Sequence, residues 1–430
     1  MPLRKFLKIS QENRIEKEIS TRYEMASVIK ACEPTPVFFE HVKKSEYQVF
    51  GNLLCTKAAF ANYLNIETVE IIPTLIQAIE SRKPPEEVKE APCQEIIISS
   101  PNLDKLPILK HFKSDGGNYI TAGVFIAKHP KYGQNADYHR CMQLSQNEMS
   151  VRIVRSRNFD TFLQDEKELD VAICIGNAPN VLVAAAISVD IGINELEIAN
   201  ALEPLKVVRA KTVDVLIPAE CEFVIEGTVF LDRKNPEGPF VDLTETYDVV
   251  RQEPTLVVKT ITHRKDPLWH ALLPGGLEHK LLMGMPREPT IYQKVNQVVE
   301  CLDVNVNPGG CSWLHAIVQI DKKDEADGKK AIAASFEGHP SCKHVFVVDD
   351  DIDIYNPLEV EWAMATRFQG DKDMVVMDKL PGSSLDPSAE AGTKLTTKIG
   401  FDLTKPVGRE STNYNKAPFP KVDIKKFLNE

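Results

Sequence analysis

The stretches Asn135-Ala-Asp-Tyr-His-Arg140 and Pro236-Glu-Gly-Pro-Phe-Val-Asp242 decide how this sequence is interpreted. Each places ionisable side chains in or beside a segment with the alternating pattern of a β-strand. Together they supply an amide, an arginine and two carboxylates, a set that can hold an anionic substrate and move a proton. The two stretches therefore predict an enzyme site built on β-structure.

The sequence around both stretches is rich in predicted strands. Alternation predicts strands over 119–127, 137–145, 148–155 and 255–262, two more within 207–230 with a break at 218–220, and one helical interlude over 178–202. In the strand over 148–155, Arg152 and Arg155 belong to a run of arginines that continues to Arg157. So much strand with few long helices favours a barrel or a sandwich for residues 101–285.

The segments on either side mix helices and strands, and 430 residues are too many for one ordinary core. In residues 1–100 the patterns predict helices over 21–31 and 67–81 and strands over 36–42 and 94–99. Apolar residues three and four apart over 291–302 predict a connecting helix within 286–304. In residues 305–430 they predict strand 313–320, helix 325–336, strand 344–348 and helix 358–368. The sequence thus predicts an α+β and α/β multidomain protein, with α/β domains at both ends.

Composition excludes several other classes of protein. The 43% hydrophobic and 26% charged content is typical of a globular protein, and no run reaches the roughly 20 apolar residues of a membrane span. A net charge of −11 without a basic stripe argues against a nucleic-acid partner. Nine scattered cysteines without a C-x-x-C pair predict reduced, buried thiols, and the amino terminus lacks a secretion signal. We therefore expect a cytoplasmic protein.

The residue types alone leave the roles of these side chains open. Arg140 could hold a substrate carboxylate, or it could merely pair with a surface acid. Near one arginine, one carboxylate of the 236–242 stretch can stay ionised while the other carries a proton. The arginine run suits phosphate recognition or a solvated strand face. The acids at 349–353 could hold a metal, although they lack the glycine and the later glutamate of an EF-hand loop, which favours capping or solvated acids.

In order and spacing, these residues resemble the UbiD-type decarboxylases. The matching motifs are Asn135-x-x-Tyr138-x-Arg140, Arg152 with Arg157, Glu195, Glu237-Gly-Pro-Phe-x-Asp242, and the segments 345–353 and 397–402. The resemblance implies that residues 101–285 form a split β-barrel that binds prenylated FMN. It also implies a divalent metal, usually manganese, at the cofactor phosphate, with a potassium ion nearby. A flavin prenyltransferase would supply the cofactor, and the protein would be a homo-oligomer.

Carried over position by position, the resemblance implies roles for individual residues. Asn135 and Glu195 would be metal ligands, and Arg140, Glu237 and Asp242 would be the catalytic trio. The flavin contacts would come from Tyr138, His139, Arg140, Arg152, Ile153, Arg157, Asn158 and Lys398. Asn158 replaces the glycine that is usual in the family, and some members have a histidine metal ligand there, so a third ligand at this position stays open.

The chain looks most similar to the compact archaeal branch of this family. That likeness implies decarboxylation of trans-anhydromevalonate 5-phosphate, a small unsaturated acid, to isopentenyl phosphate in an archaeal mevalonate pathway of isoprene biosynthesis. Decarboxylation of an aromatic or polyprenylated hydroxybenzoate is the alternative within the class. Outside it, the chain could be a flavin-binding barrel without decarboxylase activity, or a metal-dependent hydrolase built on Asp349–Asp353.

Overall fold

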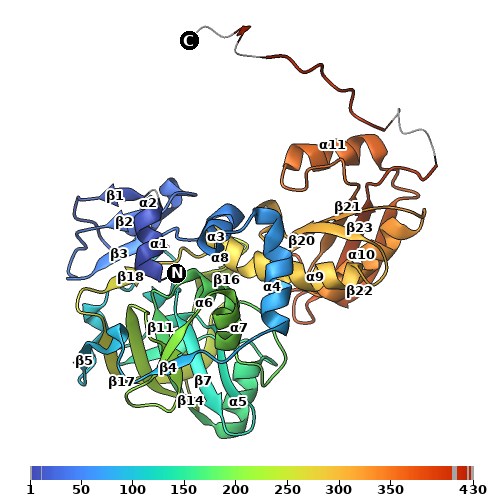
Figure 1. Cartoon of the computed structure of the whole chain (residues 1–430). Helices are drawn as coiled ribbons and strands as arrows, with labels where there is room; N and C mark the ends of the chain where they lie inside the picture. Colours follow the sequence, from blue (N-terminus) through green and yellow to red (C-terminus); the bar gives the residue numbers. More distant parts are fainter. Residues whose placement is uncertain (1, 11, 409–413, 424–425, 428–430) are drawn as a thin grey trace.

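A computed structural model describes residues 2–10, 12–408, 414–423 and 426–427. The N-terminal segment and the large central sheet pack together, and the C-terminal sheet lies beside them (Figure 1). Helices α4 (Ile71–Glu80) and α9 (Glu288–Val295) lie between the two parts, and they pack against each other. None of the helices in these described ranges is both long and apolar enough to cross a membrane.

The N-terminal segment forms a small sheet that borrows its last strand from later in the chain. Its order is β1 (Asn13–Ile15), β2 (Val37–Phe39), β3 (Gln48–Gly51) and β18 (Leu268–His270). The other elements of this segment are α1 (Leu3–Ile9), α2 (Glu24–Cys32), α3 (Lys57–Leu64) and η1 (Thr68–Glu70). Because β18 follows the central sheet in sequence, backbone hydrogen bonds join the two parts.

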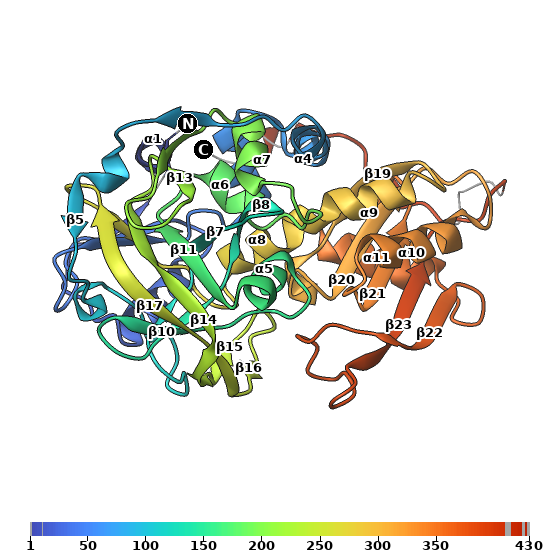
Figure 2. The ribbon, with the colours of Figure 1, turned by 90° about the horizontal axis from the view of Figure 1, so that it is seen from below.

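The central part is an antiparallel sheet that curls without closing. The strand order is β6 (Tyr119–Ile120), β9 (Cys141–Gln143), β10 (Glu148–Val151), β17 (Arg251–His263), β14 (Phe223–Glu237), β11 (Glu168–Ile175), β7 (Val124–His129) and β8 (Gly133–Tyr138), with β5 (Ile96–Ile98) on β17. In the described part of the chain the end strands β6 and β8 do not pair with each other, so the barrel is split. Figure 2 shows the long strands β14 and β17 along this sheet.

Both faces of the central sheet are buried, which explains its nearly continuous apolar strands. Along β11, Ala172 and Cys174 face one apolar core, whereas Val171 and Ile173 face another. The covering helices are α5 (Asn158–Glu166), α6 (Pro179–Ala184) and α7 (Glu195–Leu202). Smaller elements are β4 (Glu86–Val88), β12 (Lys206–Arg209), β13 (Leu216–Pro218), β15 (Phe240–Val241), β16 (Tyr247–Asp248), η2 (Pro92–Gln94) and η3 (Leu103–Lys105).

The C-terminal part is a five-stranded mixed sheet with helices on both faces. Its order is β19 (Cys301–Asn305), β20 (His315–Ile320), β21 (His344–Val348), β23 (Leu395–Asp402) and β22 (Met374–Pro381). The helical elements are α8 (Leu277–Gly284), η4 (Met285–Arg287), α9, η5 (Pro308–Gly310), α10 (Asp327–Gly338) and α11 (Pro357–Arg367). α9 and α10 pack on the face that carries Val318, and α11 packs on the face that carries Ile317.

The mixed α/β multidomain architecture confirms the predicted fold class, but several predicted elements are wrong in detail. The connecting helix ends at Val295, and Cys301–Asn305 is strand β19, because Cys301 and Val304 are buried in the C-terminal sheet at a spacing that also fits a helix. The helical interlude expected over 178–202 is confirmed, and it consists of two helices, α6 and α7. The segment 207–230 holds parts of three strands, and the strand expected over 119–127 is interrupted between Ile120 and Val124.

The predicted arginine-bearing strand is also wrong. β10 ends at Val151, so Arg152 and Arg155 lie in a loop and Arg157 stands just before α5. The side chain of Asp160 accepts a hydrogen bond from the backbone N–H of Ser156 at 2.8 Å, which supports this loop-to-helix turn. All nine cysteines are free in this structure, and seven of them are buried.

Candidate active site

Arg140 lies at a break between two strands. β8 ends at Tyr138 and β9 begins at Cys141, so His139 and Arg140 form the bend between them. Glu237 is the last residue of β14, and the turn that follows leads through β15 to Asp242. The two sequence stretches therefore meet in space, although about a hundred residues separate them.

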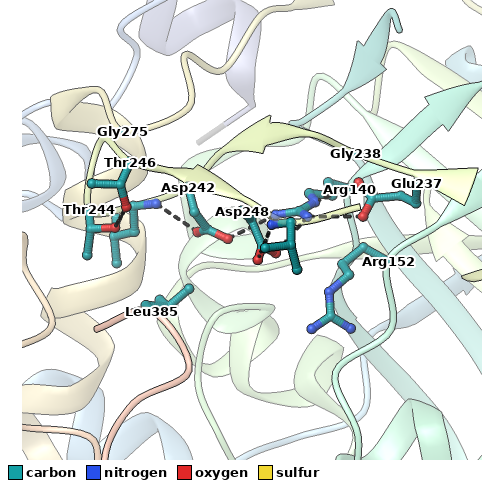
Figure 3. A network of polar contacts seen from close by, with 12 residues as sticks. Arg140, Arg152, Glu237, Gly238, Asp242, Thr244, Thr246, Asp248, Gly275 and Leu385 are labelled. Carbon is teal, nitrogen blue, oxygen red and sulfur yellow. Dashed lines mark hydrogen bonds and ion pairs between the residues drawn. The ribbon is translucent and has the colours of Figure 1, made fainter. Parts of the chain in front are cut away.

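The guanidinium of Arg140 contacts three carboxylates. Its Nε and Nη2 donate to Oε1 and Oε2 of Glu237 at 2.9 and 3.0 Å, a bidentate pair. Its Nη1 donates to Oδ2 of Asp242 at 2.9 Å, and Nη2 also donates to Oδ2 of Asp248 at 3.0 Å. Figure 3 shows Arg140 between Glu237 on one side and Asp242 and Asp248 on the other. Burial opposes the charge, yet these carboxylates raise the pKa of Arg140.

Glu237 and Asp242 differ in their access to solvent. The Glu237 side chain is 0% exposed, and its Oε1 also accepts a hydrogen bond from the hydroxyl of Tyr119 at 3.1 Å. The Asp242 side chain is 20% exposed, and its Oδ1 accepts from the backbone N–H of Leu243 at 2.7 Å. Glu237 is therefore suited to hold Arg140, whereas Asp242 can exchange a proton with solvent.

Asp248 connects Arg140 to a second arginine. Its Oδ2 also accepts a hydrogen bond from Nη1 of Arg251. Burial favours the protonated acid, but Arg251 and Arg140 hold the pKa of Asp248 below its ordinary value. The network thus holds three carboxylates, of Glu237, Asp242 and Asp248, and two guanidiniums, of Arg140 and Arg251. It carries one negative charge in excess, which favours the uptake of a proton.

A cavity opens beside this network. Its polar lining comes from both sides of the site, namely Tyr138, His139, Arg140, Arg152, Asp242, Asp248, Arg251 and His279. Its apolar lining includes Leu272, Leu282 and Met283, together with Leu385 from the loop between β22 and β23. Figure 3 shows Leu385 near Asp242, so the C-terminal part contributes to the cavity. This arrangement gives a small acid an apolar surface and charged groups at one end.

Four of the residues expected to contact a flavin line this cavity: Tyr138, His139, Arg140 and Arg152. The hydroxyl of Tyr138 donates to the carbonyl of Leu182 at 3.0 Å, and Nη1 of Arg152 donates to Glu253 at 3.0 Å. Nδ1 of His139 lies 3.2 Å from the carbonyl oxygen of Arg152, which ties the bend to the arginine loop.

The other four expected flavin contacts do not line it. Ile153 is buried in an apolar core, so it could reach a cofactor only through its backbone. Arg157 and Asn158 stand at the start of α5, where the Asn158 amide donates to the carbonyl of Val189 at 3.3 Å. Lys398 is buried on β23, and its Nζ donates to the carbonyl of Pro340.

The two expected metal ligands lie next to each other. Oε2 of Glu195 accepts a hydrogen bond from the backbone N–H of Ala136 at 2.7 Å, which brings it beside Asn135. Burial raises the pKa of Glu195 to about 8, and Nδ2 of Asn135 is buried without a hydrogen-bond partner. The buried Glu195 carboxylate forms no ion pair within the described ranges, so it lacks a counter-charge that a divalent cation would supply, and the neighbouring Asn135 amide carries a second oxygen. The donor set fits an oxygen-liganded metal.

The acids at 349–353 have protein partners instead of a free metal site. Asp349 and Asp351 both pair with Arg367, at 3.0 and 2.7 Å. Oδ1 of Asp353 accepts from the backbone N–H of Tyr355 at 2.9 Å. Among the described residues no group of three or more His, Cys, Asp or Glu side chains is arranged to hold a metal. These contacts remove the support for a hydrolase built on this segment.

Sequence reasoning missed several residues of the site. Asp248 reaches Arg140 because the short strands β15 and β16 pair, with Phe240 opposite Asp248, and Arg251 joins the network through Asp248. The signal was weak but present, since Phe240-Val241 and Tyr247-Asp248 flank a polar Thr-Glu-Thr turn. His279 and Leu385 come from elements that only the tertiary fold brings to the cavity.

The chain matches three domains of one family along most of its length. Residues 8–79, 86–277 and 280–403 match the N-terminal, Rift-related and C-terminal domains of 3-octaprenyl-4-hydroxybenzoate carboxy-lyase, UbiD. The chain therefore belongs to the UbiD family, and it is a decarboxylase of the carboxy-lyase class.

Named relatives and solved structures agree with this assignment. The chain is 42% identical, over 94% of its length and 97% of the relative, to anhydromevalonate phosphate decarboxylase of Methanothermobacter thermautotrophicus. It is 38% identical, over 93% and 95%, to the protein of the same name of Methanocaldococcus jannaschii. The UbiD-class enzyme HmfF of Pelotomaculum thermopropionicum, in complex with FMN, superposes with a TM-score of 0.96 at 33% identity and covers all of both chains. An evolved dimeric form of HmfF, in complex with prFMN, gives a TM-score of 0.91 at 32% identity, covering 99% of this chain and 100% of that one.

Proposed function

We propose that this decarboxylase converts trans-anhydromevalonate 5-phosphate to isopentenyl phosphate and CO₂ in a mevalonate pathway of isoprenoid synthesis. The support for the substrate is the name shared by the two relatives described above, which match nearly the whole chain. The observation that carries the chemistry is the Arg140 network, which places an exposed acid and a buried acid on one guanidinium beside a cavity.

We further propose prenylated FMN as the cofactor, with its supply by a flavin prenyltransferase. Tyr138, His139, Arg140 and Arg152 would contact it in the cavity, and Ile153, Arg157, Asn158 and Lys398 would contact it outside the lining described above. When bound, the modified flavin would take up the charge that develops as the C–CO₂ bond breaks. Two solved relatives that contain FMN or prFMN support this choice.

Asn135 and Glu195 would hold a divalent metal, for which manganese is our choice, with a potassium ion nearby. The support is the buried Glu195 carboxylate, which has no ion-pair partner within the described ranges, beside the Asn135 segment. Asn158 already donates to a backbone carbonyl, so we do not include it as a ligand. We also expect a homo-oligomer that works in the cytoplasm.

The residues of the Arg140 network would divide the work. Arg140 orients the substrate carboxylate, and Glu237 fixes the plane of the guanidinium through two hydrogen bonds. After CO₂ leaves, Asp242 delivers a proton to the carbon and regains it from solvent, to which its side chain is 20% exposed. The apolar side chains Leu272, Leu282 and Met283 keep water from the reacting carbon.

The test is a comparison of two acids with enzyme that was co-expressed with a flavin prenyltransferase. Release of CO₂ from the phosphorylated acid should show a lower KM, and a higher kcat, than release from the same acid without its phosphate. Equal kcat/KM for the two acids would contradict the substrate assignment. Turnover of an aromatic or polyprenylated hydroxybenzoate in its place would establish the alternative within the family.

A further inference from the structure

A buried tyrosine lies behind the Arg140 network. Tyr119, in the short strand β6, is 1% exposed. Its backbone N–H donates to the carbonyl of Leu109 at 2.7 Å, and β6 pairs with β9, where Tyr119 lies opposite Met142. Because β9 begins directly after Arg140, the same strand pair holds Tyr119 and Arg140. Backbone hydrogen bonds therefore fix the position of the phenol ring relative to the bend that carries Arg140.

The hydroxyl of Tyr119 makes two hydrogen bonds, to consecutive residues of the stretch 236–242. The backbone N–H of Gly238 donates to it at 3.0 Å, and it donates to Oε1 of Glu237 at 3.1 Å. A backbone N–H can only donate, so the hydroxyl must be the acceptor toward Gly238. Its single proton is then directed at the carboxylate of Glu237. The hydroxyl thus ties this carboxylate to the backbone of the turn that follows it.

The carboxylate of Glu237 is held by three donors. Oε1 accepts from Tyr119 and from Nε of Arg140, and Oε2 accepts from Nη2 of Arg140. The side chain of Glu237 is 0% exposed, so these protein groups set its position. Hydrogen bonds to a charged acceptor are stronger than those between neutral groups. Without the Tyr119 hydroxyl, Arg140 alone would hold the carboxylate, and the two could rotate together.

The ring of Tyr119 supports the guanidinium by a separate contact. Its centroid lies 4.2 Å from that of Phe240, and Cζ of Arg140 lies 4.8 Å from the centroid of Phe240. Phe240 also lines the cavity. The hydroxyl and the ring of Tyr119 therefore act on Arg140 through different residues. A substitution that removes only the hydroxyl separates the two effects.

The loop before β6 supports the same turn. The backbone N–H of Gly116 donates to the carbonyl of Pro239 at 2.8 Å. A Cβ atom on Gly116 would lie 2.2 Å from the carbonyl oxygen of Gly238, so only glycine permits this approach. Neither Gly116 nor Tyr119 is among the described residues that line the cavity. The segment 116–119 can therefore influence the cavity only through the residues that it contacts.

We propose that Tyr119 is a positioning residue for decarboxylation. Its hydroxyl fixes the carboxylate of Glu237 against the backbone of Gly238, and so it sets the plane of the Arg140 guanidinium. The inference rests on the roles proposed above for Arg140 and Glu237. It does not depend on which acid is the substrate.

The experiment combines Tyr119→Phe with Glu237→Gln in a double-mutant cycle. Steady-state kinetics of each single variant and of the double variant are measured with an acid that the wild type decarboxylates, on enzyme co-expressed with a flavin prenyltransferase. Flavin absorbance is recorded for the same preparations. Tyr119→Phe keeps the ring on Phe240 and removes only the hydroxyl. Tyr63→Phe is the matched control, because Tyr63 is 2% exposed and its hydroxyl donates to Oδ1 of Asn180 at 2.8 Å.

We expect Tyr119→Phe to raise KM and lower kcat together, with a loss in kcat/KM of about 10-fold and an unchanged flavin content. In the Glu237→Gln background the same change should cost about 3-fold or less, because the acceptor of the hydroxyl is then neutral. Tyr63→Phe should lower the Tm, as the loss of any buried hydrogen bond does, and leave kcat and KM at their wild-type values.

Wild-type kcat and KM in Tyr119→Phe would overturn the proposal, and so would an equal loss in the two backgrounds. Loss of flavin from Tyr119→Phe would also overturn it, since the hydroxyl would then support the cofactor rather than Glu237. Failure of the role proposed for Glu237 looks different. In that case Glu237→Gln itself has wild-type kinetics, and the proposal falls at Glu237 before Tyr119 is considered.

Discussion

Arg140 and Glu237 form two parallel hydrogen bonds, at 2.9 and 3.0 Å, between a largely buried bend and a carboxylate that is fully buried. These two hydrogen bonds fix the plane of the Arg140 guanidinium. The remaining nitrogen, Nη1, then points to Asp242. The orientation of the Arg140 guanidinium, which we propose binds the substrate, therefore depends on Glu237, a side chain that need not touch the substrate.

Replacing Glu237 with Gln should disturb both binding and rate. The neutral amide can accept only one of the two charge-assisted bonds, and it leaves Arg140 free to rotate toward Asp242 and Asp248. We expect KM to rise and kcat to fall, with a combined loss in kcat/KM of about 30-fold, or about 2 kcal/mol. Steady-state kinetics measure it, with Glu148→Gln on an exposed pair as the control. A change in KM alone would mean that Glu237 does not organise the transition state.

Part of this site could be read from the sequence and part could not. Arg140, Glu237 and Asp242 were predicted together because each sits in a motif of neighbouring residues. Asp248 was not predicted, because β15 and β16 have two residues each and are too short to show the alternating pattern of a strand. His279 and Leu385 were not predicted either, because only the tertiary fold brings α8 and the loop between β22 and β23 to the cavity.

The errors in the fold have a similar cause. Cys301 and Val304 are three apart, which suits a helix, but pairing with β20 makes the segment a strand. Arg152 follows an apolar strand pattern, yet its backbone N–H donates to the carbonyl of Arg140 and the chain then leaves the sheet. Tertiary contacts override the local pattern at both places. β21, by contrast, has the predicted bounds of 344 and 348, since its apolar run is central to a sheet.

Asp248 offers a prediction that the sequence alone did not suggest. Asp248→Asn removes one of three carboxylates around Arg140 and releases Arg251. With less negative charge nearby, a proton on the network is held less tightly. We expect the alkaline limb of the kcat profile to move to lower pH, with kcat at neutral pH reduced less than in Asp242→Asn. An unchanged pH profile of kcat in Asp248→Asn would show that Asp248 takes no part in proton delivery.

Glu195→Gln should lower metal and flavin content together. The amide is a weaker ligand than the carboxylate, and a metal held by Asn135 and Glu195 would supply positive charge for the cofactor phosphate. Metal analysis and flavin absorbance of the purified protein measure both quantities. Glu197→Gln, two residues along the same helix, should retain full content. Full manganese and flavin in Glu195→Gln would show that the ligand assignment is wrong.

His111 predicts a specific pH dependence of stability. Burial lowers its pKa to about 3, and neither ring nitrogen has a hydrogen-bond partner. In the unfolded chain the imidazole takes up a proton below its ordinary pKa of about 6.5, whereas in the folded chain it stays neutral until the pH is much lower. The free energy of unfolding is therefore at its full value above that pH and falls as the pH decreases. Between pH 7 and pH 5, protonation of His111 in the unfolded chain lowers the free energy of unfolding by about 2 kcal/mol.

His111→Phe keeps a ring against Phe240 but cannot be protonated. Thermal unfolding should therefore show a smaller loss of stability between pH 7 and pH 5 in this variant than in the wild type. His41→Gln, at an exposed position, should follow the wild type. Equal pH dependence in His111→Phe and the wild type would contradict a buried neutral imidazole.

The central claim is that Asp242 delivers the proton, and Asp242→Asn tests it most directly. Asn keeps the size of the side chain and an oxygen that can accept from the backbone N–H of Leu243, but it cannot donate an acidic proton. The measurement is kcat together with the flavin absorbance of the same preparation. The account predicts that kcat falls about 10²- to 10⁴-fold while the flavin content stays at the wild-type level. Near wild-type turnover by Asp242→Asn would contradict it, and loss of the flavin would make the role of Asp242 structural.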